Sequence, residues 1–187
     1  MAEKREAWPD QLRPIDPSCL VFLDESGAKT NMTPAYGRSF DSKRLVDHAP
    51  HGHYKLTSII GALRLTGVSA CMTVDAAVDG DSFKAYVENL LAPSLSPGDV
   101  VVMDNLSSHK RPAIERLLGA QGASVRWLPP YSPDLNPIEK MWSKIKQLLR
   151  KAKARTEETL QEAIASALRS VTAEDASGWF KSCGYPN

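Results

Sequence analysis

The stretch CLVFLD, residues 19–24, is a short apolar run that ends in an aspartate. A run of this length without internal polar residues predicts a buried strand. A second run, DVVVMD at residues 99–104, also ends in an aspartate. We therefore expect two buried strands, each with a carboxylate at the point where it ends.

Further strands and helices are expected on either side of these two runs. Residues 56–74 predict two strands joined by a tight turn near residues 65–67, and residues 123–128 predict a fifth strand. Helices are predicted at residues 81–92 with Asp81 as the N-cap, at 111–120, from Pro137 to about Lys153, and from about Glu157 to Val171. Strands that alternate with helices predict an α/β architecture, with a partly parallel sheet covered by helices.

Composition favours one globular domain. The chain has 187 residues, of which 42% are hydrophobic, so a sizeable core can form. No apolar run approaches the roughly 20 residues that span a bilayer, and the polar N-terminus lacks the apolar region of a signal peptide. Three widely spaced cysteines (Cys19, Cys71 and Cys183) predict buried or free thiols in a reducing cytosol rather than a disulfide or a zinc site. We expect an N-terminal extension at 1–18 and one domain at 19–183.

The acids that follow the two buried strands suggest a metal site. If the strands are adjacent and parallel, Asp24 and Asp104 emerge at the same edge of the sheet, where ligands of α/β proteins gather. Two carboxylates in apolar surroundings repel each other unless a cation joins them, and Mg²⁺ prefers oxygen ligands. Glu25 is the rival for the first role, although alternation points it to the other face. The alternative is that each aspartate only caps the turn that follows it.

Glu139 follows the proline-rich stretch LPPYSPDLNPIE, residues 128–139. Asn136 fits an N-cap and Pro137 the first helical position, so Glu139 is the third residue of the helix. One interpretation is a capping box, in which Glu139 folds back onto the Asn136 amide. The other is that the prolines stiffen the chain so that Glu139 is held accurately at a metal.

The three acids in their motifs resemble those of the DDE transposases. Asp24 lies in FLDES, Asp104 in VMDNLSSHK and Glu139 in LPPYSPDLNPIEKMW, with 34 residues between the last two acids. This spacing and the third motif resemble the bacterial insertion-sequence branch of the mariner superfamily. The resemblance covers about residues 20–183, and it implies a ribonuclease-H-like fold with a five-stranded mixed sheet.

The resemblance also implies a chemistry. Such domains cut DNA at transposon ends and join the 3′ hydroxyl to target DNA, and they act as dimers on DNA. Two Mg²⁺ ions, for which Mn²⁺ can substitute, would lie roughly 3.5–4 Å apart. Asp24 would bridge both ions, with Asp104 on one and Glu139 on the other. A bacterial protein of this kind is expected in the cytoplasm with the nucleoid, not in a membrane.

Residues near the acids receive weaker assignments. Asn105 and His109 could orient a phosphate or a water, although His109 also fits a helix start or an exposed position. A basic run follows Glu139, and either it contacts DNA phosphates or it is a solvated helix face. The lysines of this run that we assign to DNA are Lys140, Lys144 and Lys146.

Other motifs favour structural roles. Tyr131 and Asn136 are expected to hold the proline-rich loop. Trp142 has the spacing of a helix core position. The histidines at 48, 51 and 53 could suggest a transition metal, but their loop context favours surface histidines.

Members of the resembling family usually carry a helix-turn-helix region before the first acid. Here Asp24 comes early, so we expect no such domain in this chain and a separate or fused helix-turn-helix polypeptide as partner. The alternative function is an inactive transposase-derived module that binds DNA or protein. Loss of an acid would mark such a module, and all three acids are present.

Overall fold

A five-stranded mixed sheet forms the centre of the computed structural model, which describes residues 5–34, 36–39, 44, 46–48, 50–105 and 111–185. The strand order is β3-β2-β1-β4-β5. The first three strands along the chain pair antiparallel, whereas β4 lies parallel to both β1 and β5. The strands are β1 Leu20–Ala28, β2 Thr57–Arg64, β3 Gly67–Val74, β4 Val100–Met103 and β5 Ser124–Trp127.

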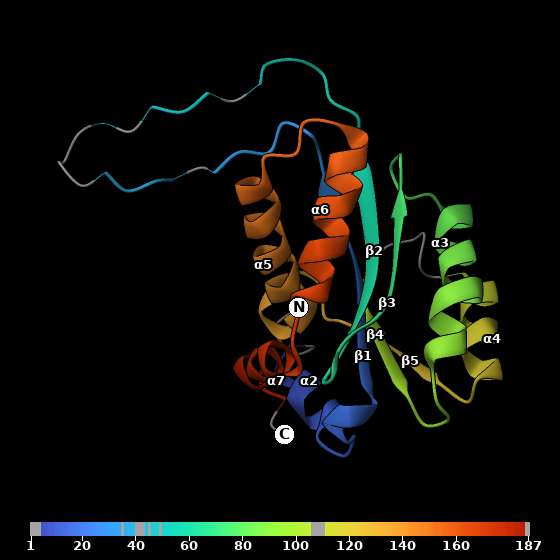
Figure 1. Cartoon of the computed structure of the whole chain (residues 1–187). Coiled ribbons are helices and arrows are strands. Elements are labelled where there is room, and N and C mark those ends of the chain that lie inside the picture. The colour runs from blue at the N-terminus through green and yellow to red at the C-terminus, as the bar shows by residue number, and fades with distance from the viewer. Residues whose placement is uncertain are drawn as a thin grey trace.

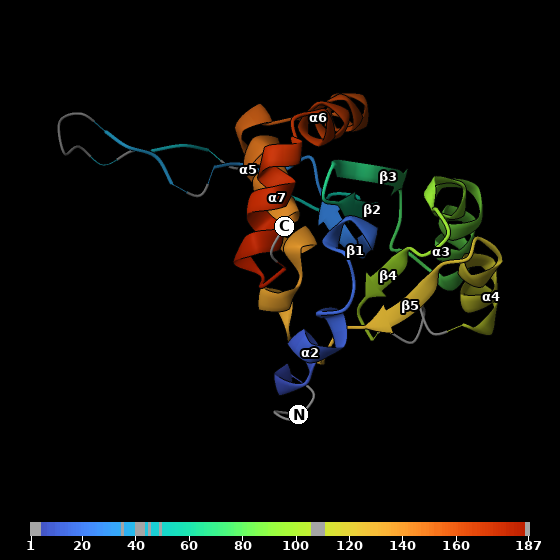
Figure 2. The same ribbon diagram turned by 90° about the horizontal axis from the view of Figure 1, so that it is seen from below.

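Helices cover both faces of this sheet, as Figures 1 and 2 show. The α-helices are α2 Trp8–Leu12, α3 Gly80–Tyr86, α4 Pro112–Ala120, α5 Pro137–Ala152, α6 Glu157–Arg169 and α7 Ala173–Ser182. α3 and α4 lie on one face and α5, α6 and α7 on the other, while the short helix α2 lies near the lower end (Figure 1). The predicted architecture, a mixed sheet of five strands flanked by helices, is confirmed.

Alternation along β1 divides the core into two clusters. Leu20 and Phe22 pack with α5, α6 and α7, where the Phe22 ring meets the Phe180 ring edge-on at 5.2 Å between centroids. Val21 and Leu23 point to the opposite face and pack with α3 and α4. By the same alternation, Asp24 belongs to the face under α5 and Glu25 to the face under α3.

Three sequence predictions need correction. β1 does not end at Asp24 but continues to Ala28, because β2 pairs with it from Phe22 to Ala28. The N-cap of α3 is Asp79 and not Asp81, since the Asp79 carboxylate accepts hydrogen bonds from the backbone amides of Asp81 and Ser82. The helix α7 has no counterpart among the predicted elements.

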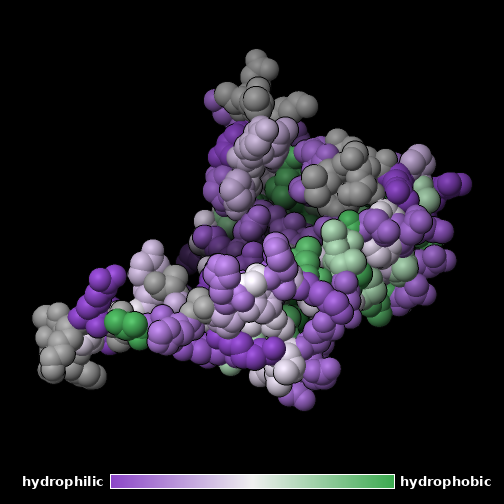
Figure 3. Space-filling model, turned by 90° about the horizontal axis from the view of Figure 1, so that it is seen from above, coloured by the Kyte–Doolittle hydropathy of each residue, from purple (hydrophilic) through white to green (hydrophobic). Residues whose placement is uncertain are grey.

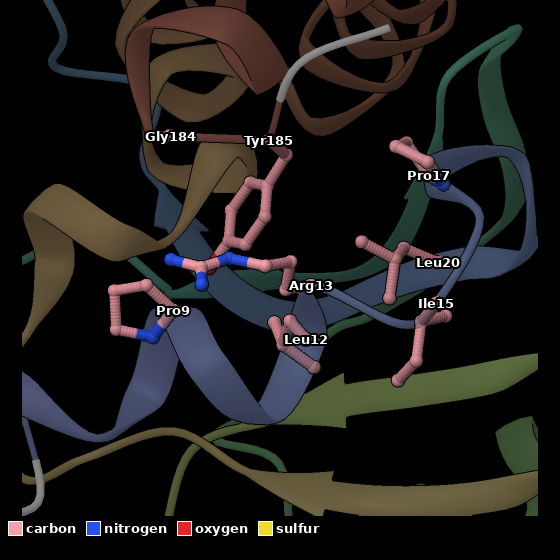
Figure 4. Close-up of a pocket in the computed structure, with 8 residues that line it drawn as sticks. All are labelled: Pro9, Leu12, Arg13, Ile15, Pro17, Leu20, Gly184 and Tyr185. Carbon is pink, nitrogen blue, oxygen red and sulfur yellow. The ribbon is translucent and has the colours of Figure 1, made fainter.

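The N-terminal segment packs onto the domain. Trp8 and Leu12 of α2 are buried, and the indole N–H of Trp8 donates to the Tyr185 hydroxyl at 2.8 Å. That hydroxyl donates in turn to the carbonyl of Leu135 at 2.7 Å. A mostly apolar pocket of about 240 Å³ lies beside this contact, and the Arg13 side chain extends across it (Figure 4).

The described parts of the segment between β1 and β2 lie outside the body of the domain, near the α5–α6 turn (Figure 1). Two basic side chains, those of Arg155 and Lys153, bind residues of this segment. Arg155 donates to the carbonyls of Thr30 and Met32, and the Lys153 ammonium pairs with Asp47 at 2.6 Å. Among the described residues, no helix is long and apolar enough to cross a membrane.

Candidate active site

Asp24 lies in the middle of β1, on the sheet face that α5 covers. Its partner across the ladder is Gly61 of β2. On the other edge, Phe22 is in register with Val102 of the parallel strand β4. Continuing that register by two residues places Asp24 beside Asp104, which directly follows β4. The condition on which the sequence prediction depended, two adjacent parallel strands, is therefore confirmed.

The environment of the Asp24 carboxyl group disfavours its charged form. Its pKa is raised from 3.8 to about 7, chiefly by burial, while the hydrogen bond from the Glu25 backbone works in the opposite direction. The negative charges of Glu139, Asp104 and Glu25 contribute to the same upward shift of the pKa. Desolvation combined with nearby like charges is the pattern that a bound cation would relieve.

Glu139 does not take part in a capping box. The backbone N–H of Asn136 donates to the Pro133 carbonyl at 3.1 Å, and the Asn136 side chain accepts no capping hydrogen bond from α5. The Asn136 Oδ1 atom is buried without a hydrogen-bond partner among the described residues. The capping interpretation of Glu139 is therefore wrong. Its exposed carboxylate is available to the cavity described next.

One open cavity of about 410 Å³ brings the three acids together. Figure 3 shows a hydrophilic hollow in the middle of the face seen from above. Glu25 does not line the cavity, which favours Asp24 over its rival. The lining residues are Asp24, Asp104, Asn105, Leu128, Pro129, Pro130, Tyr131, Ser132, Pro133, Asn136 and Glu139.

The donor set fits divalent cations held by pairs of acids. In the part of the chain that the structure describes, no three His, Cys, Asp or Glu side chains lie close enough together to hold a single ion. An arrangement in which Asp24 shares one ion with Asp104 and another with Glu139 needs only pairs. Carboxylate oxygens are the ligands that Mg²⁺ and Mn²⁺ accept.

Arg5 clamps the proline-rich segment that leads to Glu139. Its guanidinium donates to the Tyr131 carbonyl at 3.0 Å and to the Ser132 hydroxyl at 2.8 Å, and it forms a two-pronged ion pair with the Asp134 carboxylate at 3.1 and 2.7 Å. Apolar patterning could not reveal this contact, because 126 residues separate Arg5 from Tyr131.

Tyr131 is positioned differently from the sequence prediction. Its side chain is 87% exposed, so it does not hold the loop by packing. Its backbone is left-handed, with φ of 55°, which is uncommon for a residue other than glycine. An exposed ring on a strained segment at the rim of an acidic cavity is a candidate for substrate contact.

The other assigned residues fall in different environments. Asn105 lines the cavity, and its side-chain amide donates to the Leu128 carbonyl. His109 lies outside the described residues. The Lys144 ammonium donates to the Ser170 carbonyl and pairs with Asp175, which gives it a structural partner between helices.

Lys140 is exposed, Lys146 is half-buried, and Trp142 is a core residue at 2% exposure, as predicted for it. His48, His51 and His53 are exposed, and among the described residues they belong to no metal-binding group.

Residues 19–161 match the family model described as DDE superfamily endonuclease. No curated protein matches the chain. Among solved structures, the pre-cleavage Mos1 transpososome has a chain with a TM-score of 0.81 and 16% identity, covering 97% of this chain and 58% of its own. The Mos1 mariner paired-end complex with Mn gives 0.76 at 16% identity, covering 97% and 57%.

The catalytic domain of Mos1 mariner transposase gives a TM-score of 0.73 at 15% identity, covering 97% of this chain and 85% of that one. The sheet and its helices therefore have the ribonuclease-H-like fold of that domain. The chain spans only about 58% of the length of the chain in the transpososome.

Proposed function

The chain belongs to the DDE superfamily of endonucleases, and we propose that it is the catalytic domain of a transposase of the bacterial insertion-sequence type. In this proposal it cuts DNA strands at transposon ends and transfers the 3′ ends to target DNA. The observation that carries the proposal is the single cavity lined by Asp24, Asp104 and Glu139.

Each acid has a distinct role in this proposal. The negative charges of both Asp104 and Glu139 act on Asp24, so Asp24 would help to hold both ions, whereas Asp104 and Glu139 would each help to hold one. Two divalent ions, Mg²⁺ or Mn²⁺, would supply the charge that activates the attacking hydroxyl and stabilises the leaving 3′ oxygen. No covalent bond between enzyme and DNA is needed, so the remaining residues of the cavity bind and orient the substrate.

DNA is the partner that this surface would bind. Tyr131 and Asn105 lie on the cavity wall, where they would contact a nucleotide beside the scissile phosphate. Lys140 is exposed one residue after Glu139 and Lys146 follows on the same helix, so both would contact DNA phosphates. We assign the DNA role to these two lysines rather than to Lys144, whose ammonium is already paired with Asp175.

Recognition of specific transposon ends would need more than this surface. We propose a helix-turn-helix polypeptide, separate or fused, and a dimer that holds two ends together. A substrate of this kind would place the protein in the cytoplasm with the nucleoid.

The test is metal-dependent nicking of supercoiled DNA by the purified chain, compared with two variants. Glu139→Gln keeps the shape of the side chain and is expected to abolish nicking. Glu25→Gln is the matched control, because Glu25 is the acid next to Asp24 but does not line the cavity. Nicking that survives Glu139→Gln would refute the acid assignment, and nicking lost in Glu25→Gln but kept in Asp24→Asn would transfer the first role to Glu25.

A further inference from the structure

Gly61 occupies the position on β2 directly opposite Asp24. It pairs with Asp24 across one edge of β2 and with Cys71 of β3 across the other. Residues directly opposite each other in antiparallel strands project to the same face. A side chain at position 61 would therefore point toward α5, beside the Asp24 carboxylate.

The Trp142 indole fills the space that such a side chain would need. A Cβ atom built on Gly61 would lie 2.9 Å from Cη2 and 3.2 Å from Cζ2 of Trp142, and 3.6 Å from Cε of Met141. Carbon atoms in ordinary contact lie about 3.5–4.0 Å apart. The indole is rigid and only 2% exposed, so it has little freedom to swing aside without moving the helix that carries it.

Trp142 is three residues after Glu139 in α5, and residues with that spacing lie on the same side of a helix. We propose that Gly61 is a positioning residue for the acid site: by lacking a side chain it lets Trp142 and the start of α5 approach the sheet, which sets the separation of Glu139 from Asp24. This inference rests on the proposed function, since it concerns metal binding by the same acids. It assigns a role to a residue that touches no reacting atom.

The test compares Gly61→Ala with two other glycine-to-alanine variants. Gly178→Ala adds a methyl group that meets nothing within 4 Å. Gly27→Ala adds one that lies 2.8 Å from the Leu56 side chain, away from α5. The readouts are Mn²⁺ affinity by calorimetry and the Mn²⁺ concentration needed for half-maximal nicking, with circular dichroism to confirm folding.

We expect Gly61→Ala to lower the Mn²⁺ affinity by about 10- to 100-fold, as loss of a residue that orients ligands does. Both control variants should bind Mn²⁺ as the unmodified chain does. Trp142→Phe removes Cη2 and Cζ2, so the double variant Gly61→Ala/Trp142→Phe should recover most of the affinity. A purely destabilising methyl group would not be rescued in this way.

Unchanged Mn²⁺ affinity in Gly61→Ala would overturn the inference while leaving the proposed function intact. A loss that the double variant does not restore would overturn it as well. If Gly61→Ala alone does not fold, the double variant still tests the inference. Mn²⁺ binding by the double variant that is tenfold weaker than in the unmodified chain would contradict the inference. Absence of Mn²⁺ binding in the unmodified chain would instead refute the proposed function, and the inference with it.

Discussion

The two faces of the sheet are built from the same strands, but they differ in polarity. Under α3 and α4, the buried residues that the structure describes include Val21, Leu23 and Ile60, all exposed by 1% or less. Under α5, Asp24 lies among the apolar residues with a raised pKa. On α5 itself, the Trp142 Nε1 atom is buried without a hydrogen-bond partner among the described residues. Unpaired buried polar groups cost stability, so the face under α5, which also carries part of the core, gives up some stability to form a site.

The sharpest test of this difference is Asp24→Asn. If the polar face exists for catalysis, replacing the carboxylate should lower the nicking rate by at least about 10²- to 10³-fold, as loss of a central electrostatic group does. The fold should remain intact, because the change is nearly isosteric. Nicking assays with Mg²⁺ and with Mn²⁺ measure the effect, and a variant that still cuts within tenfold of the original rate would contradict the assignment.

Leu23→Ala changes the face under α3 and α4, where it removes apolar contacts and no polar group. Leu23 is 1% exposed, and truncating a buried leucine costs about 3 kcal/mol of unfolding free energy through lost burial and a cavity. The nicking rate per folded molecule should be unchanged. Urea denaturation measures the stability; a large loss of specific activity in fully folded Leu23→Ala would show that the two faces are not separable.

The raised pKa of Asp24 predicts a pH dependence in metal-free protein. The folded pKa of about 7 lies above the ordinary value of 3.8, so the native state holds this proton more tightly than the unfolded chain. The contribution of Asp24 to stability is therefore present at low pH and lost as pH rises through this window. Between about pH 5 and about pH 6.5 the loss is about 2 kcal/mol.

Urea denaturation in EDTA at several pH values measures this contribution as the difference between the unmodified chain and Asp24→Asn. Other acids titrate in both proteins and cancel in the difference. The variant should become the more stable of the two as pH rises. A difference that is independent of pH would show that Asp24 is not held in an unfavourable environment.

The smallest expected effect on stability comes from the clamp on the proline-rich segment. Arg5→Ala removes an ion pair whose side chains are 39% and 59% exposed, so the unfolding free energy should fall only slightly. The nicking rate should fall severalfold, since the segment before Glu139 loses its tether. Arg13→Ala is the matched control, because Arg13 pairs, within the described part of the chain, only with nearby Asp10. Equal rates for the two variants would show that the clamp has no role in the site.

Much of the site could be predicted from the sequence because its parts are local. Apolar runs marked β1 and β4, and the acids stand at fixed offsets from them. The proline-rich segment with Asn136 and Pro137 marked the start of α5. The core position of Trp142 followed from helical spacing, because an amphipathic stripe repeats along a single element.

Features that depend on distant partners could not be predicted in this way. The extension of β1 to Ala28 is caused by the ladder with β2, which begins 29 residues later at Thr57. The role of Lys144 depended on Asp175 from another helix. The clamp at Arg5 reaches Asp134, and the buried Trp8 contacts Tyr185 near the other end of the chain, so no local pattern reports these contacts.

The strand order also has a consequence for folding during synthesis. β1 can pair with β2, and β2 with β3, as soon as this meander leaves the ribosome, but the other edge of β1 waits for β4, which begins 72 residues after β1 ends, at Val100. Contacts between distant segments form late, because the chain must close long loops first. Asp24 is thus synthesised first, Asp104 is synthesised later, and Glu139 is synthesised last of the three acids. A partly synthesised chain therefore lacks a complete set of acids, and the capacity to cut DNA that we propose could arise only after α5 has been made.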